Sequence, residues 1–90
     1  MTKQQLEQFA EQLFAQAVPN LPKMTERQKT TTMLLAKGLT TEEVGEAMGI
    51  KYNGSHCHVK AVYEKLGVQN RAQLVLRLVV ASQAGKEVQA

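Results

Sequence analysis

The chain has 90 residues, a single cysteine, two histidines and a net charge of +3 at neutral pH. This length makes one small domain. A single cysteine excludes an internal disulfide. Two histidines without a second thiol do not have the spacing of a zinc finger, and we expect no metal and no cofactor. No apolar run approaches the ~20 residues that span a bilayer, and the start lacks the order of a signal peptide. The sequence therefore predicts a cytoplasmic protein that does not bind membranes.

The positive charge is unevenly distributed along the chain. Residues 1–22 carry Lys3 against Glu7 and Glu11, whereas the remainder is basic. A weakly basic domain that follows an acidic-to-neutral first helix in the sequence is compatible with nucleic-acid binding but does not demonstrate it.

The first predicted helix follows Thr2, which can cap it, and ends at Pro19 and Pro22. Its apolar residues recur at amphipathic spacing: Leu6, Phe9, Ala10, Leu13, Phe14, Ala17 and Val18. This stripe has to be buried against its own domain, a twin subunit or a foreign protein partner, and packing in the chain's own core is favoured. We therefore describe residues 1–22 as an N-terminal amphipathic helix with its linker.

A capping box predicts the start of the second helix at Thr25, with Gln28 as its second member. The helix should run to about Lys37, and Gly38 can adopt the left-handed turn that ends it. Residues 30–32 are three threonines, which are poor helix formers, so the helix has to be held by apolar side chains in the core. The expected core residues are Met33, Leu34 and Ala36.

The next two predicted helices are short and closely joined. Thr40 opens a second capping box, and the helix that follows ends at Gly49. Only residues 50–53 separate it from a central helix that ends at Gly67. Two short helices joined so tightly form a helix-turn-helix, in which the second helix is presented to a partner.

The central helix, at about residues 53–66, has two different faces. Apolar residues at three- and four-residue spacing form one face: Val59, Val62, Tyr63 and Leu66. The opposite face is polar: His56, Cys57, Lys60 and Glu64. One face should anchor the helix to the domain, and the other should contact the partner.

A last helix is predicted after a cap at Asn70, and it is apolar nearly all the way round. We expect one side to meet the core and another to meet an identical helix across a two-fold axis. The residues expected in that dimer contact are Leu74, Val75, Leu78, Val79 and Ser82. Alternatively, the first helix covers the second side within the same chain. Residues 85–90 are predicted to be a flexible tail.

Residues 24–76 resemble the DNA-binding domain of the LuxR/FixJ/GerE family of bacterial transcription regulators. The most specific match is the run KLGVQNRAQL at residues 65–74. Further matches are Met24-Thr25-x-Arg27, Ala36-x-Gly38-Leu39-Thr40, Glu43-Val44, Met48-Gly49-Ile50, His58 and Val62. The resemblance implies an all-α, four-helix domain, here at residues 23–84 behind the extra N-terminal helix, in a bacterial or phage-encoded protein. Its third helix would enter the major groove, and its fourth would dimerise.

The chain departs from the family pattern at the start of the central helix. Residues 54–58 read GSHCH where the family usually has Thr-Val-Lys-x-His, so only His58 agrees. Gly54 should weaken the first turn by roughly 1 kcal/mol relative to alanine. The helix is therefore expected to start late, with Asn53 or Ser55 as its cap. The threonines at 30–32 replace an acidic and two aliphatic family residues.

The resemblance also assigns DNA contacts. His56, Cys57 and Lys60 occupy the base-contacting positions, with Asn53 and Tyr52 close enough to assist. The residues expected at the phosphate backbone are Lys51, Thr40, Thr41, Lys37 and Lys65, and His58 is expected either to contact a phosphate or to hydrogen-bond within the domain. Successive helical residues point about 100° apart, so the adjacent histidines and cysteine cannot converge on a metal ion, and no catalytic constellation is visible.

Two functions follow. The first is a stand-alone, sequence-specific transcription regulator that binds double-stranded DNA as a homodimer. The second is a protein-interaction module, such as an anti-activator, that keeps the fold but has lost DNA recognition. The altered segment at residues 54–56 favours the second function, whereas Lys60, His58 and the Asn70-Arg71 motif favour the first. Neither function is enzymatic.

Overall fold

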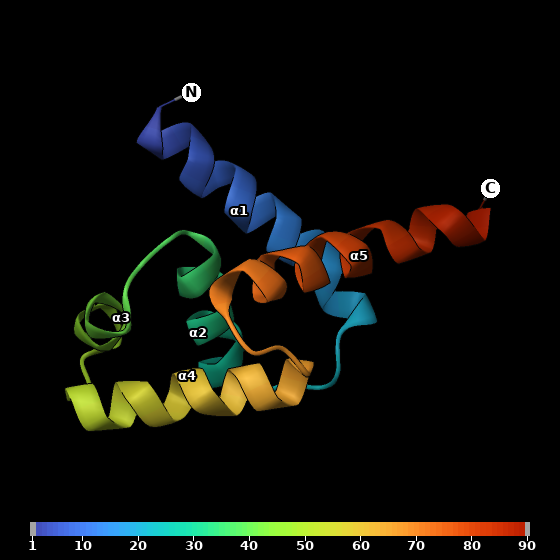
Figure 1. Ribbon diagram of the computed structural model, residues 1–90. Helices are drawn as coiled ribbons and strands as arrows, with labels where there is room; N and C mark the ends of the chain where they lie inside the picture. Colours follow the sequence, from blue (N-terminus) through green and yellow to red (C-terminus); the bar gives the residue numbers. More distant parts are fainter. Residues whose placement is uncertain (1, 90) are drawn as a thin grey trace.

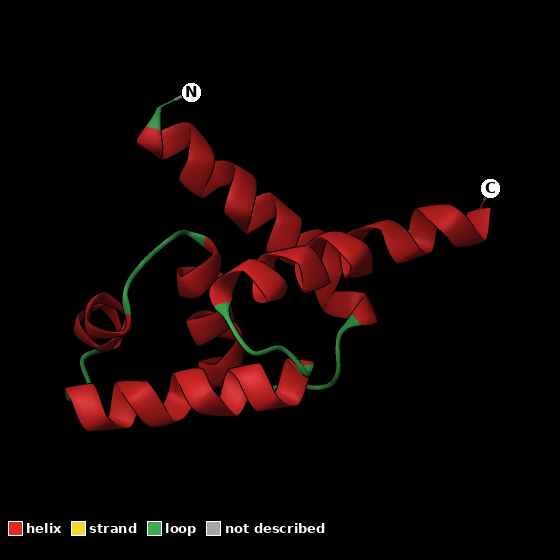
Figure 2. Ribbon diagram, in the orientation of Figure 1, coloured by secondary structure: helices red, strands yellow, loops and turns green. Residues whose placement is uncertain are grey.

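The computed structural model describes the backbone of residues 2–89 and the side chains of residues 2–51 and 54–84. Within that part the chain contains only helices and loops (Figures 1 and 2). The elements are α1 (Lys3–Ala17), the 3-10 helix η1 (Val18–Asn20), α2 (Glu26–Ala36), α3 (Thr41–Met48), α4 (Tyr52–Leu66) and α5 (Arg71–Gln89). The predicted all-α class is confirmed. Helix α5 continues through most of residues 85–90, and the predicted flexibility of that tail lies outside the described side chains.

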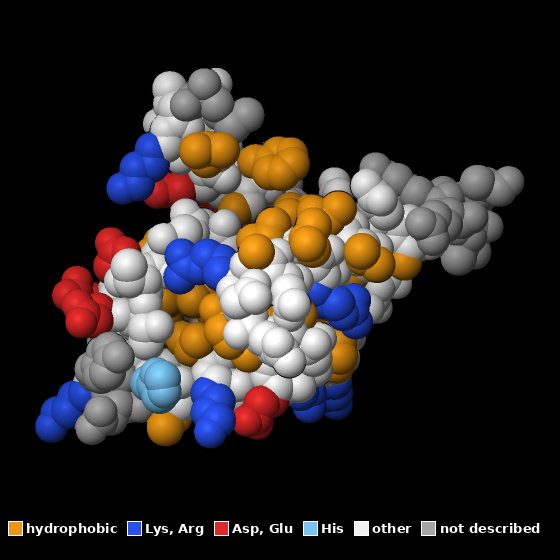
Figure 3. Space-filling view, in the orientation of Figure 1, with side chains coloured by type: hydrophobic (Ala, Val, Ile, Leu, Met, Phe, Trp, Pro, Cys, Tyr) orange, Lys and Arg blue, Asp and Glu red, His pale blue; other side chains and the backbone are white. Residues whose placement is uncertain are grey.

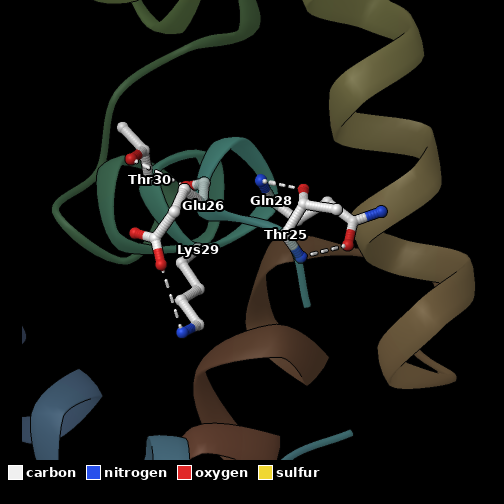
Figure 4. A network of polar contacts seen from close by, with 5 residues as sticks. All are labelled: Thr25, Glu26, Gln28, Lys29 and Thr30. Carbon is white, nitrogen blue, oxygen red and sulfur yellow. Dashed lines mark hydrogen bonds and ion pairs between the residues drawn. The ribbon is translucent and has the colours of Figure 1, made fainter. Parts of the chain in front are cut away.

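Local hydrogen bonds set the first residue of each of the first three α-helices. In each, the hydroxyl of a threonine accepts a hydrogen bond from the backbone N–H of the residue three positions later. The side chain of that residue in turn accepts a hydrogen bond from the backbone N–H of the threonine. The pairs are Thr2 with Gln5, Thr25 with Gln28 and Thr40 with Glu43. Figure 4 shows the second pair. The predicted caps at these three threonines are therefore confirmed.

The capping box at α3 makes stability depend on pH. The backbone N–H and the side chain of Thr40 hydrogen-bond Glu43 and lower the pKa of its carboxyl group below the ordinary value. A carboxylate whose folded pKa is depressed adds stability above its unfolded pKa of roughly 4.3, and loses it as pH falls through the folded pKa. We expect the thermal midpoint to fall on acidification below about pH 4. Glu43→Gln keeps the acceptor oxygen but cannot titrate, so its thermal midpoint should fall less steeply with decreasing pH in circular dichroism melts. An equal fall of the midpoint in both proteins would contradict this.

The core of α2 differs from the prediction. Leu35, Thr31 and Thr32 are its fully buried side chains, whereas Met33, Leu34 and Ala36 are only half-buried. Two threonines can be buried because each hydroxyl donates to the carbonyl four residues earlier, at 2.8 Å in both cases. That bond satisfies the polar group, so the methyl group can pack in the core.

All five α-helices contribute to one core. Helix α4 forms one edge of the molecule, α5 lies across the core from it, and α1 crosses α5 (Figure 1). The core residues are Phe14, Ala17, Met24, Leu35, Val44, Val59, Val62, Leu66, Leu74, Leu78 and Ala81. The side-chain amide of Asn20 donates to the carbonyl of Ala81 at 2.8 Å and fastens η1 to α5.

The apolar stripe of α1 is only partly buried. Its C-terminal half packs in the core through Phe14 and Ala17, while Leu6 and Phe9 remain 55% and 60% exposed. An ion pair of 2.6 Å between Glu11 and Lys37 joins the opposite flank of α1 to the end of α2. Helix α1 also packs against α5, so the alternative that α1 covers part of α5 within the same chain is what the structure shows.

Candidate nucleic-acid interface

A tight turn joins α3 to α4. Gly49 has φ +69°, in the left-handed region that favours glycine, and the N–H of Ile50 donates to the carbonyl of Gly45 at 2.9 Å. Helix α4 begins at Tyr52, and Lys51 precedes it without a capping hydrogen bond from its side chain. The turn holds the start of α4 directly against α3.

The prediction that α4 starts late was wrong. Asn53 lies inside the helix, and Ser55 is a fully buried residue. The hydroxyl of Ser55 donates to the carbonyl of Thr41 at 2.5 Å. Because this bond satisfies the serine across the α3–α4 contact, Ser55 joins two helices instead of capping one.

The two helices pack so closely at Gly45 that an added side chain would force its neighbours to shift. A Cβ atom at Gly45 would lie 3.0 Å from the Ser55 Cβ and 3.2 Å from the Ile50 carbonyl oxygen. These distances are shorter than ordinary van der Waals contact. Sequence reasoning missed this role of Gly45, and the only available signal was a glycine in the interior of a short helix, one turn before the tight turn.

Helix α4 has the two faces that were predicted. Val59, Val62 and Leu66 are buried in the core, and Tyr63 is half-buried. The other side is exposed: His56, Cys57, Lys60 and Glu64. Figure 3 shows basic, acidic and histidine side chains along this edge of the molecule. The chain itself therefore leaves a polar row uncovered on α4.

The other predicted DNA contacts differ in how accessible they are. Thr40, Lys51 and Lys65 are exposed, whereas Thr41 and His58 are half-buried. The predictions for the side chains of Asn53 and Tyr52 lie outside the described residues. Lys37 is a poor candidate for a phosphate contact, because its ammonium group pairs with Glu11 and its side chain is only 16% exposed.

A shallow hollow lies beside the polar row, between the start of α3 and the turn after α4. Val59 and Val68 are among its apolar lining residues, and Thr41, Lys60 and Gln69 are among its polar ones. A hydroxyl, an amide and an ammonium group around one concave strip can donate hydrogen bonds to an anionic backbone. The hollow thus continues from α4 towards α3 and the start of α5, with a mixed lining that also includes the Glu64 carboxylate.

The Asn70-Arg71 motif has a structural role. The side-chain oxygen of Asn70 accepts from the N–H of Gln73 at 2.9 Å and caps α5, as predicted. The Arg71 guanidinium donates to the carbonyl of Leu39, in the loop between α2 and α3. This contact sets α5 against the helix-turn-helix, so the motif positions the site.

The residues predicted for dimerisation divide into two groups. Leu74 and Leu78 are completely buried in the chain's own core, which corrects their assignment, because fully buried side chains cannot contact a partner. Val75, Val79 and Ser82 are half-buried. The exposed apolar side chains of α5 are instead Leu76 and Val80, at 63% and 64% exposure.

Residues 2–51 and 54–84 contain no group of three or more His, Cys, Asp or Glu side chains that could hold a metal ion. In the same part of the chain, no helix has the length and hydrophobicity required to cross a lipid bilayer.

Two short helices in a tight turn, with the second presenting an uncovered polar side, define a helix-turn-helix protein of the DNA-binding class. The model of the family described as "Bacterial regulatory proteins, luxR family" matches residues 22–78. The chain belongs to this family, as its sequence resemblance predicted.

Curated relatives agree with the family assignment. YhjB of Escherichia coli K12, named as an HTH-type transcriptional regulator, is 29% identical over 65 residues, covering 72% of this chain and 32% of YhjB. SgaR of Hyphomicrobium methylovorum and DesR of Bacillus subtilis 168 are named as transcriptional regulatory proteins. SgaR is 38% identical over 55 residues (61% of this chain, 26% of SgaR), and DesR is 30% identical over 70 residues (78% and 33%). The chain thus spans about a third or less of these relatives. No solved structure matches it significantly.

Proposed function

We propose that the chain is a transcription regulator that binds double-stranded DNA sequence-specifically, with α4 in the major groove. The observation that carries the proposal is the uncovered polar row on α4, whose opposite side is locked into the core. A major groove about 12 Å wide accepts one α-helix. An anchored helix with a solvent-exposed polar side is what such binding requires.

Each exposed cation of α4 has a proposed role. Lys60, in the middle of the row, donates to guanine O6 or N7, the usual partners of a lysine in the major groove. His56 and Cys57 lie in the same row and contact base edges beside it. Lys51 and Lys65, at the two ends of α4, bind phosphates, and one DNA strand runs along the hollow beside Thr41. Phosphate contacts supply affinity and base contacts supply specificity.

The regulator is proposed to act as a homodimer that binds two half-sites about one helical turn apart. Helix α5 supports this proposal with the half-buried side chains of Val75, Val79 and Ser82 and the exposed ones of Leu76 and Val80. That the chain acts as a stand-alone regulator in the cytoplasm stays a prediction, because the matched region makes up only 32%, 26% and 33% of the three relatives.

A salt titration tests the proposed DNA binding. Binding to random duplex DNA should be micromolar at low salt and should weaken steeply as salt rises, because each phosphate contact releases counterions. Fluorescence anisotropy of a labelled duplex measures this dependence. An absence of binding at low salt would reject the DNA-binding proposal.

A protein-interaction module is the second candidate. It is favoured by Leu6 and Phe9, exposed apolar side chains outside the helix-turn-helix, and by the acidic Glu64 in the polar row of α4. In this function the fold would pair with a related regulator and would not contact DNA. An intact, helical chain that shows no affinity for duplex DNA at any salt concentration would favour this second candidate over the first.

A further inference from the structure

A second hollow lies on the opposite flank of α4 from the hollow beside Thr41, which we call the first hollow. The second one lies between the end of α4 and the start of α2, and we call it the α2–α4 hollow. The residues that line it are Lys23, Met24, Thr25, Gln28 and Lys65. Successive helical residues are about 100° apart, so Lys65 lies about 180° around α4 from His56. His56 lines the first hollow, so the two hollows lie on either side of α4.

The lining of the α2–α4 hollow is positively charged. Lys23 and Lys65 come from different elements, both side chains are exposed, and no acidic residue is among those that line the hollow. The carboxylates closest to them in the sequence lie elsewhere: Glu26 pairs with Lys29 at 3.5 Å, and Glu64 lines the first hollow. Of the two hollows, the α2–α4 hollow therefore suits an anionic ligand better.

The side-chain amide of Gln28 adds a hydrogen-bond donor to the α2–α4 hollow. Its oxygen accepts from the backbone N–H of Thr25 at 3.0 Å in the capping box of α2, so its NH2 group can donate to another acceptor. Figure 4 shows this nitrogen turned away from Thr25, towards α4. Lysine ammonium groups and glutamine amides are among the usual partners of DNA phosphates. The hollow thus combines two cations and a neutral donor that can bind a phosphate.

A helix in the major groove has a phosphate strand on each of its flanks. The groove is about 12 Å wide, and an α-helix with its side chains is about 10–12 Å across, so the helix approaches both walls. One strand is proposed to run along the first hollow. The other strand then passes along the opposite flank of α4, where the α2–α4 hollow lies.

We infer that the α2–α4 hollow binds phosphates of the second DNA strand, with Lys23 and Lys65 as cations and Gln28 as a hydrogen-bond donor. This inference rests on the proposed DNA-binding function and adds to it the loop before α2 and the start of α2. DNA is then held on both flanks of α4. Because phosphates are the same at every base pair, the hollow contributes affinity and orientation and no sequence preference.

Lys23→Ala tests this inference by removing one cation from an exposed loop position. Binding to random duplex DNA should weaken by roughly 10-fold at about 50 mM salt, and the slope of log affinity against log salt concentration should become shallower by about 0.9, because one phosphate contact is lost. The preferred sequence, selected from a randomised duplex library, should stay the same. Lys3→Ala is the matched control, since it removes the same charge from an exposed position that lines neither hollow. Fluorescence anisotropy measures both affinities.

Gln28→Glu is a second test, which leaves both lysines in place. The carboxylate keeps an acceptor oxygen for the capping box but replaces the donor group by a negative charge, so DNA binding should weaken. Gln5→Glu is its matched control, because it makes the same change in the capping box of α1, outside both hollows. Circular dichroism confirms that every variant is as helical as the unmodified chain.

Ethylation of single phosphates in a selected duplex identifies the strand that the hollow contacts. The unmodified chain should show interference from phosphates of both strands, and Lys23→Ala should lose interference on one strand only. If the unmodified chain binds DNA but Lys23→Ala keeps its salt slope and its interference pattern, this inference alone is overturned, as it is if Gln28→Glu binds like Gln5→Glu. An unmodified chain that binds no duplex DNA at low salt overturns the proposed function and this inference together.

Discussion

Gly45→Val is expected to lower the free energy of unfolding by about 2–3 kcal/mol, because overpacking at a close helix contact forces neighbouring groups apart. The first added carbon would lie 3.0 Å from the Ser55 Cβ and 3.2 Å from the Ile50 carbonyl. A backbone oxygen cannot move away without changing the turn. The start of α4 should therefore shift from α3 and weaken the hydrogen bond between Ser55 and Thr41. Urea unfolding followed by circular dichroism measures the change.

Gly54→Ala is the matched control within the same helix-turn-helix. A Cβ atom at Gly54 meets only the Ile50 Cδ1, at 4.0 Å, which is ordinary contact. Alanine should therefore stabilise the first turn of α4 by about 0.5–1 kcal/mol through its higher helix propensity. The free energy of unfolding is therefore expected to fall for Gly45→Val and to rise for Gly54→Ala. An unchanged stability for Gly45→Val would show that α3 and α4 are not held at this distance in solution.

Lys60→Ala is expected to weaken binding to the specific operator by roughly 5- to 150-fold, since a lysine–guanine contact contributes about 1–3 kcal/mol of discrimination. Affinity for random DNA should change much less. A selection from a randomised duplex library should then show that the preference at one base pair per half-site is lost. Lys60 carries this prediction because it is the exposed cation in the middle of the polar row of α4.

Two further lysines serve as controls for the effect of charge. Lys51→Ala, immediately before α4, should weaken binding to all sequences alike. It should also make the slope of log affinity against log salt concentration shallower by about 1, the value for one phosphate contact. Lys3→Ala removes the same charge from α1, outside the polar row of α4, and should leave operator selectivity unchanged. If Lys60→Ala binds the operator like the parent, the proposed orientation of α4 in the groove is wrong.

The helix boundaries were largely predictable because they depend on local interactions. A threonine followed three residues later by Gln or Glu forms its hydrogen bonds within one turn, so the pattern predicts the start of a helix wherever the rest of the chain lies. Gly49 and Gly67, at φ +69° and +71°, end α3 and α4 for an equally local reason. The two faces of α4 followed from the spacing of its apolar residues alone.

Predictions that depended on neighbours distant in sequence were less accurate. Thr31 and Thr32 were expected to need support from other side chains of α2, yet both are fully buried. Each hydroxyl bonds a carbonyl only four residues earlier, but its burial depends on other elements, such as Met48 of α3 beside Thr31. Lys37 was expected to contact phosphate, but α1 places Glu11 beside it. In each case the deciding atom comes from another turn or another helix.

By itself, the sequence determined where α1, α2 and α3 begin, where α3 and α4 end, which side of α4 is apolar, and to which family the chain belongs, because these features lie in residues only a few positions apart. Only the tertiary structure decided which of two similar glycines lies at a close helix contact, and which apolar residues of α5 stay exposed. Leu74 and Leu76 have the same chemistry, yet one is fully buried and the other is 63% exposed. The difference arises because α5 is apolar on every side, so only the packing of the other helices selects the side that is covered.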